Sequence, residues 1–212
     1  MNTVRITEHE DPRRAKSRAR VLAATVDVLR EEGFAGLSIE AVAARSGVAK
    51  TTIYRQFADR DELHLAAVQS VGCRVPLEYS ATLIADVTAY CVGLNQMLRG
   101  SDFGALLSTA VDGAERSESF AGMMHDFGVE RRALLGQRLR AAVSDETLPA
   151  DVDLDVLTSQ LVGPLFYRRF ISRQPTGPAF VGRHVSLILS PLVAPRPDRA
   201  SSGSGGSPRS TR

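Results

Sequence analysis

The sequence of 212 residues predicts an all-α protein of about nine helices, with a three-helix domain followed by a larger helical bundle. Three observations support this fold class. Apolar side chains recur at helical spacing along most of the chain. Glycines, prolines and capping residues interrupt these stripes where helices would end. No segment shows the alternating pattern of a strand. The length allows one large domain or two small ones, and either would bury a substantial core.

The first helix is predicted over residues 14–32. Gly33 marks its end, because glycine readily takes the left-handed backbone of a helix C-cap. Residues 1–12 are polar and end in Asp-Pro, which predicts a flexible amino-terminal arm. The apolar stripe of the helix has the spacing i, i+1, i+4, i+7 and i+8, and consists of Val21, Leu22, Thr25, Val28 and Leu29.

Residues 38–57 have the pattern of two short helices joined by a tight turn. Ser38 is a good N-cap for the first helix. Gly47 suits the turn, because only glycine takes a left-handed backbone there without steric cost. The second helix is expected over residues 50–57, with Ile53 and Phe57 facing the core. This arrangement predicts a helix-turn-helix whose second helix enters the major groove of DNA.

The polar side chains of this second helix suit contact with DNA. Basic groups neutralise phosphates or reach guanine, and threonines donate to phosphate or touch a thymine methyl. Between Pro12 and Arg60, ten Lys and Arg residues stand against five Asp and Glu residues, and such an excess steers a protein to a duplex. The alternative is an ordinary helical hairpin with a solvated polar face. The candidate DNA-contacting residues of this helix are Lys50, Thr51, Thr52, Tyr54, Arg55 and Gln56.

A fourth helix is predicted to connect the helix-turn-helix to the rest of the chain. Asp59 is its expected N-cap, and Glu62 follows at the spacing of a capping box. Pro76 stops any longer helix, because the residue before a proline resists helical geometry. We therefore place the domain boundary at about residues 72–78. Any signal from the second domain must reach the DNA-binding helices through this fourth helix.

Five more helices are predicted after the boundary, each with an apolar stripe. Residues 194–212 are mostly Pro, Arg, Ser and Gly, which cannot bury apolar surface, so we expect a disordered tail. The predicted helices span residues 80–99, 102–115, 119–144, 153–173 and 178–191.

The segment from Leu37 to Leu63, LSIEAVAARSGVAKTTIYRQFADRDEL, resembles the DNA-binding domain of the TetR family of transcriptional regulators. The resemblance covers residues 13 to about 70, and the later part of the chain is similar only in its helical character and length. It implies a helix-turn-helix DNA-binding domain at residues 13–72. It also implies a helical effector-binding and dimerisation domain at residues 79–193.

The resemblance further suggests how such a chain acts. Its partners would be a double-stranded DNA operator, a small-molecule effector and a second copy of itself, since a two-fold dimer places two recognition helices about one helical turn apart. Arg60 fits a phosphate-contacting position of the family, and we expect Ser38 and Tyr54 to hold phosphates as well. An effector would move the helix at 60–72 and change the half-site spacing. We therefore favour a repressor released by a small apolar effector, although an activator would use the same DNA-binding domain.

Two groups of apolar residues in the second domain are candidates for binding. Flexible Met side chains suit a pocket for variable ligands, and plain core packing is the alternative. The last two helices carry more apolar side chains than a monomer needs to bury, which indicates an interface. The candidate effector-binding residues are Phe103, Met123, Met124 and Phe127. The candidate dimer-interface residues are Leu161, Leu165, Phe166, Val181, Val185 and Ile188.

Other function classes find little support. The four histidines show no metal-ligand spacing, and no nucleophile elbow, Walker A loop or dinucleotide motif is present, so we expect neither an enzyme nor a cofactor or metal site. No apolar run reaches the roughly 20 residues of a membrane span, and the start of the chain lacks a signal-peptide core, so we expect a cytoplasmic protein. Two alternatives stay open. One is a redox-sensing regulator that uses Cys73 and Cys91, and the other is a helical enzyme or carrier with a vestigial helix-turn-helix.

Overall fold

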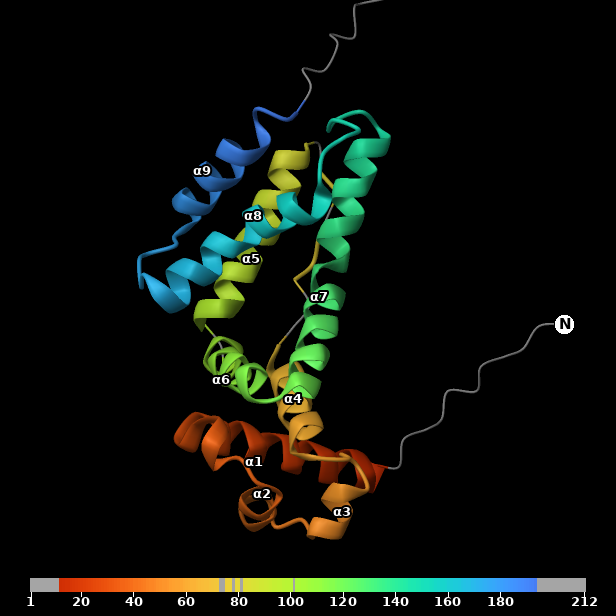
Figure 1. The fold of residues 1–212 in the computed structure, drawn as a ribbon, viewed down its shortest axis with the longest axis vertical. Coiled ribbons are helices and arrows are strands. Elements are labelled where there is room, and N and C mark those ends of the chain that lie inside the picture. Colours follow the sequence, from red (N-terminus) through yellow and green to blue (C-terminus); the bar gives the residue numbers. More distant parts are fainter. Residues whose placement is uncertain (1–11, 73–74, 78, 81, 101, 194–212) are drawn as a thin grey trace, which may run out of the picture.

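The computed structural model describes residues 12–72, 75–77, 79–80, 82–100 and 102–193. Within these ranges the chain forms nine α-helices and one short π-helix and contains no strand, so the all-α prediction is confirmed. The first three helices form a head at one end of an elongated molecule, and the last five form a bundle at the other (Figure 1). The predicted arm, apart from Pro12, and the predicted tail lie outside the described residues.

The capping predictions for the head are confirmed. Gly33 interrupts the first helix with a φ of 70°. Ser38 Oγ accepts a hydrogen bond from the Ala41 amide at 3.1 Å, as an N-cap does. Gly47 has a φ of 65°, and its amide donates to the Ala43 carbonyl, so the left-handed turn is present. The three helices of the head are α1 (Pro12–Gly36), α2 (Ile39–Ser46) and α3 (Lys50–Tyr54).

Helix α3 is shorter than predicted, because it ends at Tyr54 and not at residue 57. The amides of Gln56 and Phe57 both donate to the Ile53 carbonyl, at 2.8 and 2.9 Å, and close a tight turn. This turn carries Phe57 into the core, where only 1% of it is exposed. Burial of the ring therefore takes precedence over a further helical turn.

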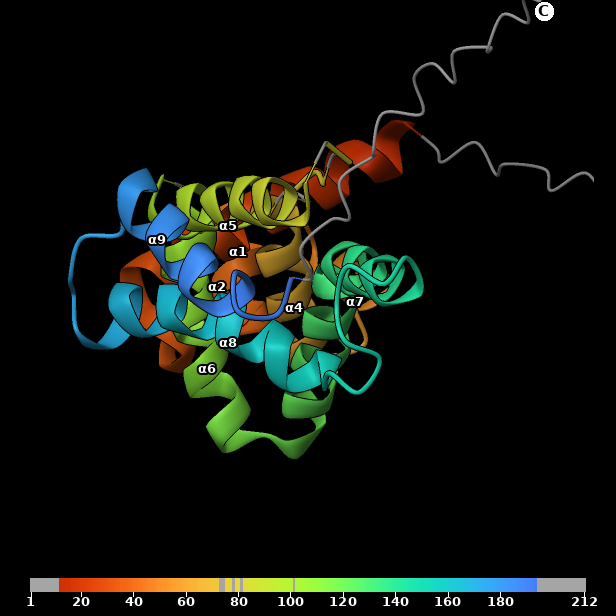
Figure 2. The same cartoon turned by 90° about the horizontal axis from the view of Figure 1, so that it is seen from above.

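The bundle follows the predicted order of helices with two differences. The first helix starts at residue 83, three residues later than expected, and the helix predicted over 153–173 continues into a π-helix. Pro164 lies inside that helix and offers no amide hydrogen to it. The elements are α5 (Leu83–Gly100), α6 (Asp102–Arg116), α7 (Glu118–Ser144), α8 (Leu154–Phe166), the π-helix η1 (Tyr167–Ile171) and α9 (Pro178–Leu189). Figures 1 and 2 place α7 and α9 on opposite sides of the bundle.

Helix α4 (Arg60–Val71) joins the head to the bundle and packs on α1, α6 and α7. Its start is closed by the predicted capping box. Asp59 accepts from the Glu62 amide at 2.8 Å, and Glu62 accepts from the Ala58 amide at 2.6 Å. Ser117, at the start of α7, donates to Asp61 at 2.7 Å. Because α6 also packs on α1, the head and the bundle share one continuous apolar core.

An ion pair is buried between α5 and α7. Arg138 Nε lies 2.7 Å from Asp86 Oδ2, and the two side chains are 9% and 0% exposed. Burial alone raises the pKa of Asp86, but hydrogen bonds from Ser80 and Arg138 outweigh it and hold the pKa below its ordinary value. The pair therefore stays ionised in the folded protein and fixes these two helices against each other.

Candidate nucleic-acid interface and ligand cavity

Helix α3 presents one polar face at the end of the head. Thr51, Tyr54 and Arg55 are exposed, and Thr52 is half-buried. Ile53 is fully buried and anchors the helix to the core. The structure thus brings four of the six predicted side chains of this helix to the outer end of the molecule, three of them exposed and Thr52 partly covered.

Lys50, at the start of α3, is engaged in an ion pair. Its Nζ lies 2.7 Å from Oε1 of Glu40 in α2, and both side chains are more than half exposed. The hydrogen bond from Lys50 lowers the pKa of Glu40. The stretch around Lys50 contains no acid in the sequence, so the prediction missed a carboxylate that the preceding helix supplies. In the free chain Lys50 therefore points to Glu40, and contact with phosphate requires this exposed pair to open.

Gln56 does not face outward as predicted. Because α3 ends at Tyr54, the following turn directs Gln56 towards α1, where its Nε2 lies 3.4 Å from Ser17 Oγ. The residue is half-buried, and its Oε1 has no hydrogen-bond partner among the described residues. Gln56 is placed to hold the turn after α3 against α1. It therefore does not belong with the outward-facing candidates for DNA contact.

The two candidate phosphate ligands outside α3 have different surroundings. Ser38 is half-buried and uses its hydroxyl to cap α2, which leaves the oxygen partly engaged. Arg60 is exposed at the start of α4, and its guanidinium lies over the Phe34 ring, 4.4 Å from the centroid. Stacking of this kind orients the guanidinium, and its Nε also lies 3.7 Å from Oδ1 of Asp61, so contact with a phosphate would compete with this pair.

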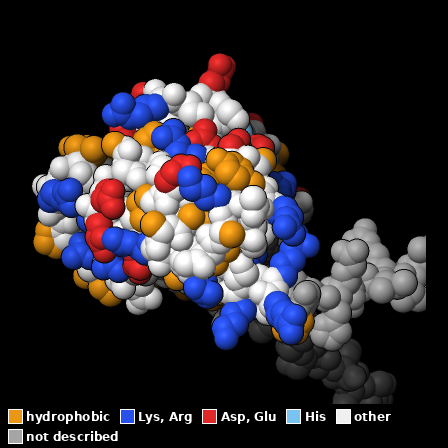
Figure 3. Space-filling view, turned by 90° about the horizontal axis from the view of Figure 1, so that it is seen from below, with side chains coloured by type: hydrophobic (Ala, Val, Ile, Leu, Met, Phe, Trp, Pro, Cys, Tyr) orange, Lys and Arg blue, Asp and Glu red, His pale blue; other side chains and the backbone are white. Residues whose placement is uncertain are grey.

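Basic residues of α1 hold the head together, which the sequence analysis did not predict. Arg20 donates from Nη2 to the Ser46 carbonyl at the end of α2. The guanidinium of Arg18 lies over the Phe57 ring, 4.6 Å from its centroid. Figure 3, which views the head end, shows Lys and Arg side chains along the lower and right-hand edge, while the left-hand part mixes both signs of charge. The positive surface is therefore uneven across this face.

A cavity of about 190 Å³ lies between α5, α6, α7 and α8. Three of the four predicted effector-binding residues, Phe103, Met124 and Phe127, line it. Met123 is not among the lining residues and packs, half-buried, against the core. The polar part of the wall was not predicted from the sequence, and it consists of Tyr90, Arg131 and Arg132. Two adjacent arginines on an otherwise apolar helix face were the signal that could have found it.

The wall of this cavity touches the carboxyl end of α4. Arg131 Nη2 donates to the Gly72 carbonyl, the C-cap of α4, at 2.7 Å. A Cβ on residue 72 would lie only 2.7 Å from the Phe103 ring, so the glycine lets the helix end approach that ring closely. The Tyr90 hydroxyl donates to the Arg131 carbonyl at 3.3 Å.

Most of the predicted interface residues are buried inside the chain itself. Helices α8 and α9 pack on each other and on α5, so their most apolar sides cover the core of their own bundle. Phe166 lines the cavity, and Ile188 is half-buried. Four of the six predicted interface residues are 0% exposed and therefore cannot contact a second copy of the chain in this conformation. They are Leu161, Leu165, Val181 and Val185.

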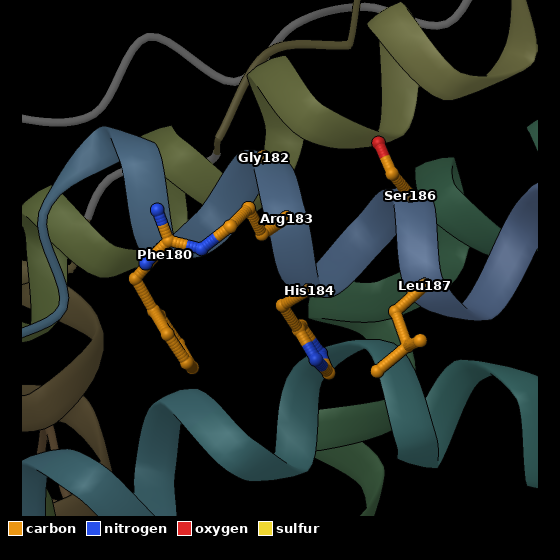
Figure 4. Close-up of a pocket in the computed structure, with 6 residues that line it drawn as sticks. All are labelled: Phe180, Gly182, Arg183, His184, Ser186 and Leu187. Atoms are coloured by element: carbon orange, nitrogen blue, oxygen red, sulfur yellow. The ribbon is translucent and has the colours of Figure 1, made fainter.

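A second apolar strip on α9 lies at the surface, where Leu187 is exposed while Phe180 and His184 are half-buried, and the Arg168 guanidinium lies 3.9 Å from the centroid of the Phe180 ring. Leu187 is 77% exposed, and Phe180 and His184 precede it at helical spacing with stacked rings 5.8 Å apart. Figure 4 shows these three side chains pointing to the same side, towards α8, along a shallow groove. Tyr167, in η1, adds another exposed aromatic ring to the α8–α9 part of the surface. These residues, and not the buried set, form the outward side of the last two helices.

His64 is fully buried where α4 meets the bundle. Its ring stacks on Phe120, with centroids 4.7 Å apart, and also contacts Phe34. His64 Nε2 lies 3.0 Å from Thr109 Oγ1, whose own hydrogen is donated to the Leu106 carbonyl at 2.7 Å. Nε2 must therefore be the donor, and this assigns the neutral tautomer. Burial is the main cause that lowers the pKa of His64 to about 4.

Cys91 is poorly suited to redox sensing. Its thiol is fully buried, and burial raises its pKa to about 12, so the reactive thiolate is scarce. Cys73 lies outside the described residues. Among the residues that the structure describes, no cluster of His, Cys, Asp and Glu could hold a metal ion. None of the described helices has the length and apolar character needed to span a bilayer.

Both halves of the chain match known protein families. Residues 21–67 match the family described as "Bacterial regulatory proteins, tetR family". Residues 80–188 match the family described as "Tetracyclin repressor-like, C-terminal domain". Among curated proteins, the uncharacterized HTH-type transcriptional regulator YdeS of Bacillus subtilis is 23% identical over 172 residues, covering 80% of this chain and 86% of the relative. The corresponding regulator Rv1556 of Mycobacterium tuberculosis is 26% identical over 173 residues, covering 82% and 86%.

Solved structures show the same architecture. The TetR family transcription regulator SCO0332 superimposes with a TM-score of 0.64 at 30% sequence identity, covering 84% of this chain and all of the other. MexZ, described as a key repressor responsible for antibiotic resistance in Pseudomonas aeruginosa, superimposes with a TM-score of 0.63 at 17% identity, covering 84% and 96%. The second likeness shows the fold alone.

Proposed function

The chain belongs to the TetR family of transcriptional regulators, and from this we propose that it is a repressor that leaves its operator when a small molecule enters the bundle. Members of the family are DNA-binding transcription factors that dimerise, and they are not enzymes. The observation that carries the proposal is the contact between the cavity wall and the end of α4, because it joins a ligand site to the helix that supports the DNA-binding head.

The exposed face of α3 is the proposed reading surface. Thr51, Thr52 and Tyr54 offer hydroxyl groups, and Arg55 offers a planar donor suited to phosphate or guanine. Lys50 joins them once its pair with Glu40 opens, which costs little because solvent screens an exposed ion pair. Arg60 is the proposed phosphate ligand at the edge of the footprint.

The apolar strip at the surface of α9 is the proposed centre of the dimer interface. Leu187, Phe180 and Tyr167 supply apolar and aromatic surface of the kind that interface cores use. A two-fold axis near this strip would place the two heads on one side of the dimer, where they could reach half-sites about 34 Å apart. The buried residues of the same helices support the interface from beneath.

Effector entry is proposed to act through α4. The cavity wall contacts Gly72 at one end of this helix, and Asp61 at its other end is tied to Ser117 of α7. A ligand that breaks or shifts these contacts therefore shifts the head as well. In a dimer this changes the separation of the two copies of α3, and the operator can then hold only one head at a time.

Fluorescence anisotropy on a labelled duplex from the upstream region of the chain's own gene tests this function. Wild-type protein should bind this duplex more tightly than random DNA across a salt series. Thr52→Ala and Tyr54→Ala should each weaken specific binding by roughly 1–3 kcal/mol, the value of one good base contact. Thr147→Ala, a threonine far from the head on the loop after α7, is the matched control and should bind as the wild type does.

Two results would count against the proposal. Equal and steeply salt-dependent binding to both duplexes would show a phosphate-binding surface without sequence preference. Unchanged affinity of both α3 variants, with the dimer intact in sedimentation, would remove α3 as the reading helix.

A further inference from the structure

Resting on the proposed function, we propose that the effector is a small carboxylic acid with an apolar body of about one aromatic ring, and that its carboxylate draws Arg131 away from Gly72. The acid would bind in the cavity between α5, α6, α7 and α8. Its binding would then break the contact between Arg131 and the carboxyl end of α4. Both parts of the proposal follow from side chains in the cavity wall.

The volume of the cavity limits the size of the ligand. At about 190 Å³ it is smaller than the pockets that hold drug-sized molecules, which start near 300 Å³. A cavity of about 150 Å³ is enough for benzene. One ring with a carboxylate, or an aliphatic acid of similar volume, therefore fills the space. The Phe103 and Phe127 rings provide the apolar walls for such a body.

The charge of the wall selects an anion. Arg131 and Arg132 are among the lining residues, and none of the lining residues within the described ranges is Asp or Glu. No ion pair of Arg132 with a carboxylate occurs in the described ranges of the chain. A carboxylate that enters an apolar cavity needs a charged partner to offset its lost hydration. Guanidinium groups supply one with matched planar geometry, and such charge-assisted bonds are the stronger ones.

Tyr90 holds the backbone of the wall in place. Burial raises the pKa of Tyr90 to about 12, so its phenol is protonated at neutral pH. The hydroxyl donates to the Arg131 carbonyl across the cavity at 3.3 Å. With the backbone fixed in this way, a ligand can displace the Arg131 side chain without moving α7 away from α5.

The Arg131 side chain links the ligand site to α4. Its Nη2 donates to the Gly72 carbonyl at 2.7 Å, and its guanidinium lies 4.8 Å from the centroid of the Phe127 ring. A cation at a helix carboxyl end is favourable, because the last carbonyls have no partner within the helix. A ligand carboxylate is a stronger acceptor than a neutral carbonyl. Binding therefore exchanges one acceptor of Arg131 for another and frees the end of α4.

The first test compares acids with neutral molecules of the same shape. Isothermal titration calorimetry at pH 7.5 would measure benzoate and phenylacetate against benzamide and phenylacetamide, using the full-length wild-type protein. We expect each acid to bind at least about tenfold more tightly than its amide, as a charge-assisted hydrogen bond implies. Arg132→Gln should reduce this preference, because of the two wall arginines Arg131 alone is then left to pair with the carboxylate. Arg140→Gln, an exposed arginine of the same helix outside the cavity, should retain it.

The second test follows the link to α4. On the upstream duplex, the acids and not the amides should lower the DNA affinity of the wild type. Arg131→Gln should lower DNA affinity without ligand and show no further response to acid. Arg131→Met, which keeps the aliphatic stem over Phe127, should behave in the same way. Circular dichroism and thermal melting would confirm that both variants fold.

The outcomes separate this inference from the proposed function. Equal binding of acids and amides, or no binding of either acid, would overturn the ligand class even if the wild type binds its operator. Wild-type DNA affinity and a normal acid response in both Arg131 variants would overturn the link through Gly72. Failure of the wild type to prefer its upstream duplex would instead count against the proposed function, and the calorimetry would still decide the ligand class.

Discussion

Acid should loosen the junction between head and bundle through one buried side chain, His64. The neutral ring fits between Phe34 and Phe120 and donates from Nε2 to Thr109. Protonation would place a hydrogen on Nδ1, which is buried and has no acceptor among the described residues. Among neighbouring charges, Asp61 favours the protonated form and Arg60 opposes it, and both count for less than burial.

The size of the effect follows from the shift in pKa. The pKa of His64 is about 4 in the folded chain, against an ordinary value of 6.5. The unfolded chain therefore binds more protons between these two values, and stability falls as the pH decreases through this window. At about 1.4 kcal/mol per unit, the loss at pH 5 is about 2 kcal/mol. That is a large part of the roughly 5–15 kcal/mol that stabilises a typical domain.

Urea denaturation between pH 7.5 and pH 5 would measure this loss. His64→Phe keeps a ring of similar size in the stack and removes the titrating group, so its stability should fall by about 2 kcal/mol less than that of the wild type. His125→Gln removes an exposed histidine of α7 and serves as the control. The reasoning is refuted if His64→Phe and the wild type lose the same stability over this pH range.

Three further predictions concern other parts of the chain. Gly47→Ala should destabilise the head by about 1–2 kcal/mol, since φ there is 65°, whereas Gly182→Ala, in open space on α9, should not; urea melts compare the two. Iodoacetamide at pH 8 should leave Cys91 unmodified in the folded chain and label it in urea, because burial raises its pKa to about 12. Labelling of the Cys91 peptide from the native protein would contradict this. Leu187→Glu should weaken the proposed dimer at least about tenfold in sedimentation, as expected for a charge at an interface core. Val111→Glu, which changes an exposed valine of α6, should not.

The fold was largely predictable because the residues that start and end its helices act locally. Ser38, Gly47 and Asp59 act within one turn of themselves, so the sequence reveals the helix ends that they set. The length of α3 was not predictable in this way. It ends at Tyr54 because Phe57 is drawn into a core built by other helices, and such tertiary competition leaves no local signature.

The type of each candidate site could be predicted from the sequence, but the residues that form it could be predicted only in part. Exposure on α3 followed from helical spacing, but the partner of Lys50 comes from the preceding helix. On α8 and α9 an excess of apolar residues was visible in the sequence. Which of them face the core depends on how the helices rotate against α5, so the buried Val185 and the exposed Leu187 could not be told apart.

The contacts between α1 and the helix-turn-helix determine how DNA binding by the head can respond to the effector. Arg20 holds the end of α2, Arg18 covers Phe57, and Ser17 lies against Gln56. These three contacts hold the end of α2 and the turn after α3, so we expect α3 to keep its orientation within its own head. A duplex with a single half-site should therefore be blind to the effector, and only the two-fold operator should register it. In the proposed dimer, the ligand would change the distance between the two DNA-binding heads. It would leave the DNA-contacting surface of each head unchanged.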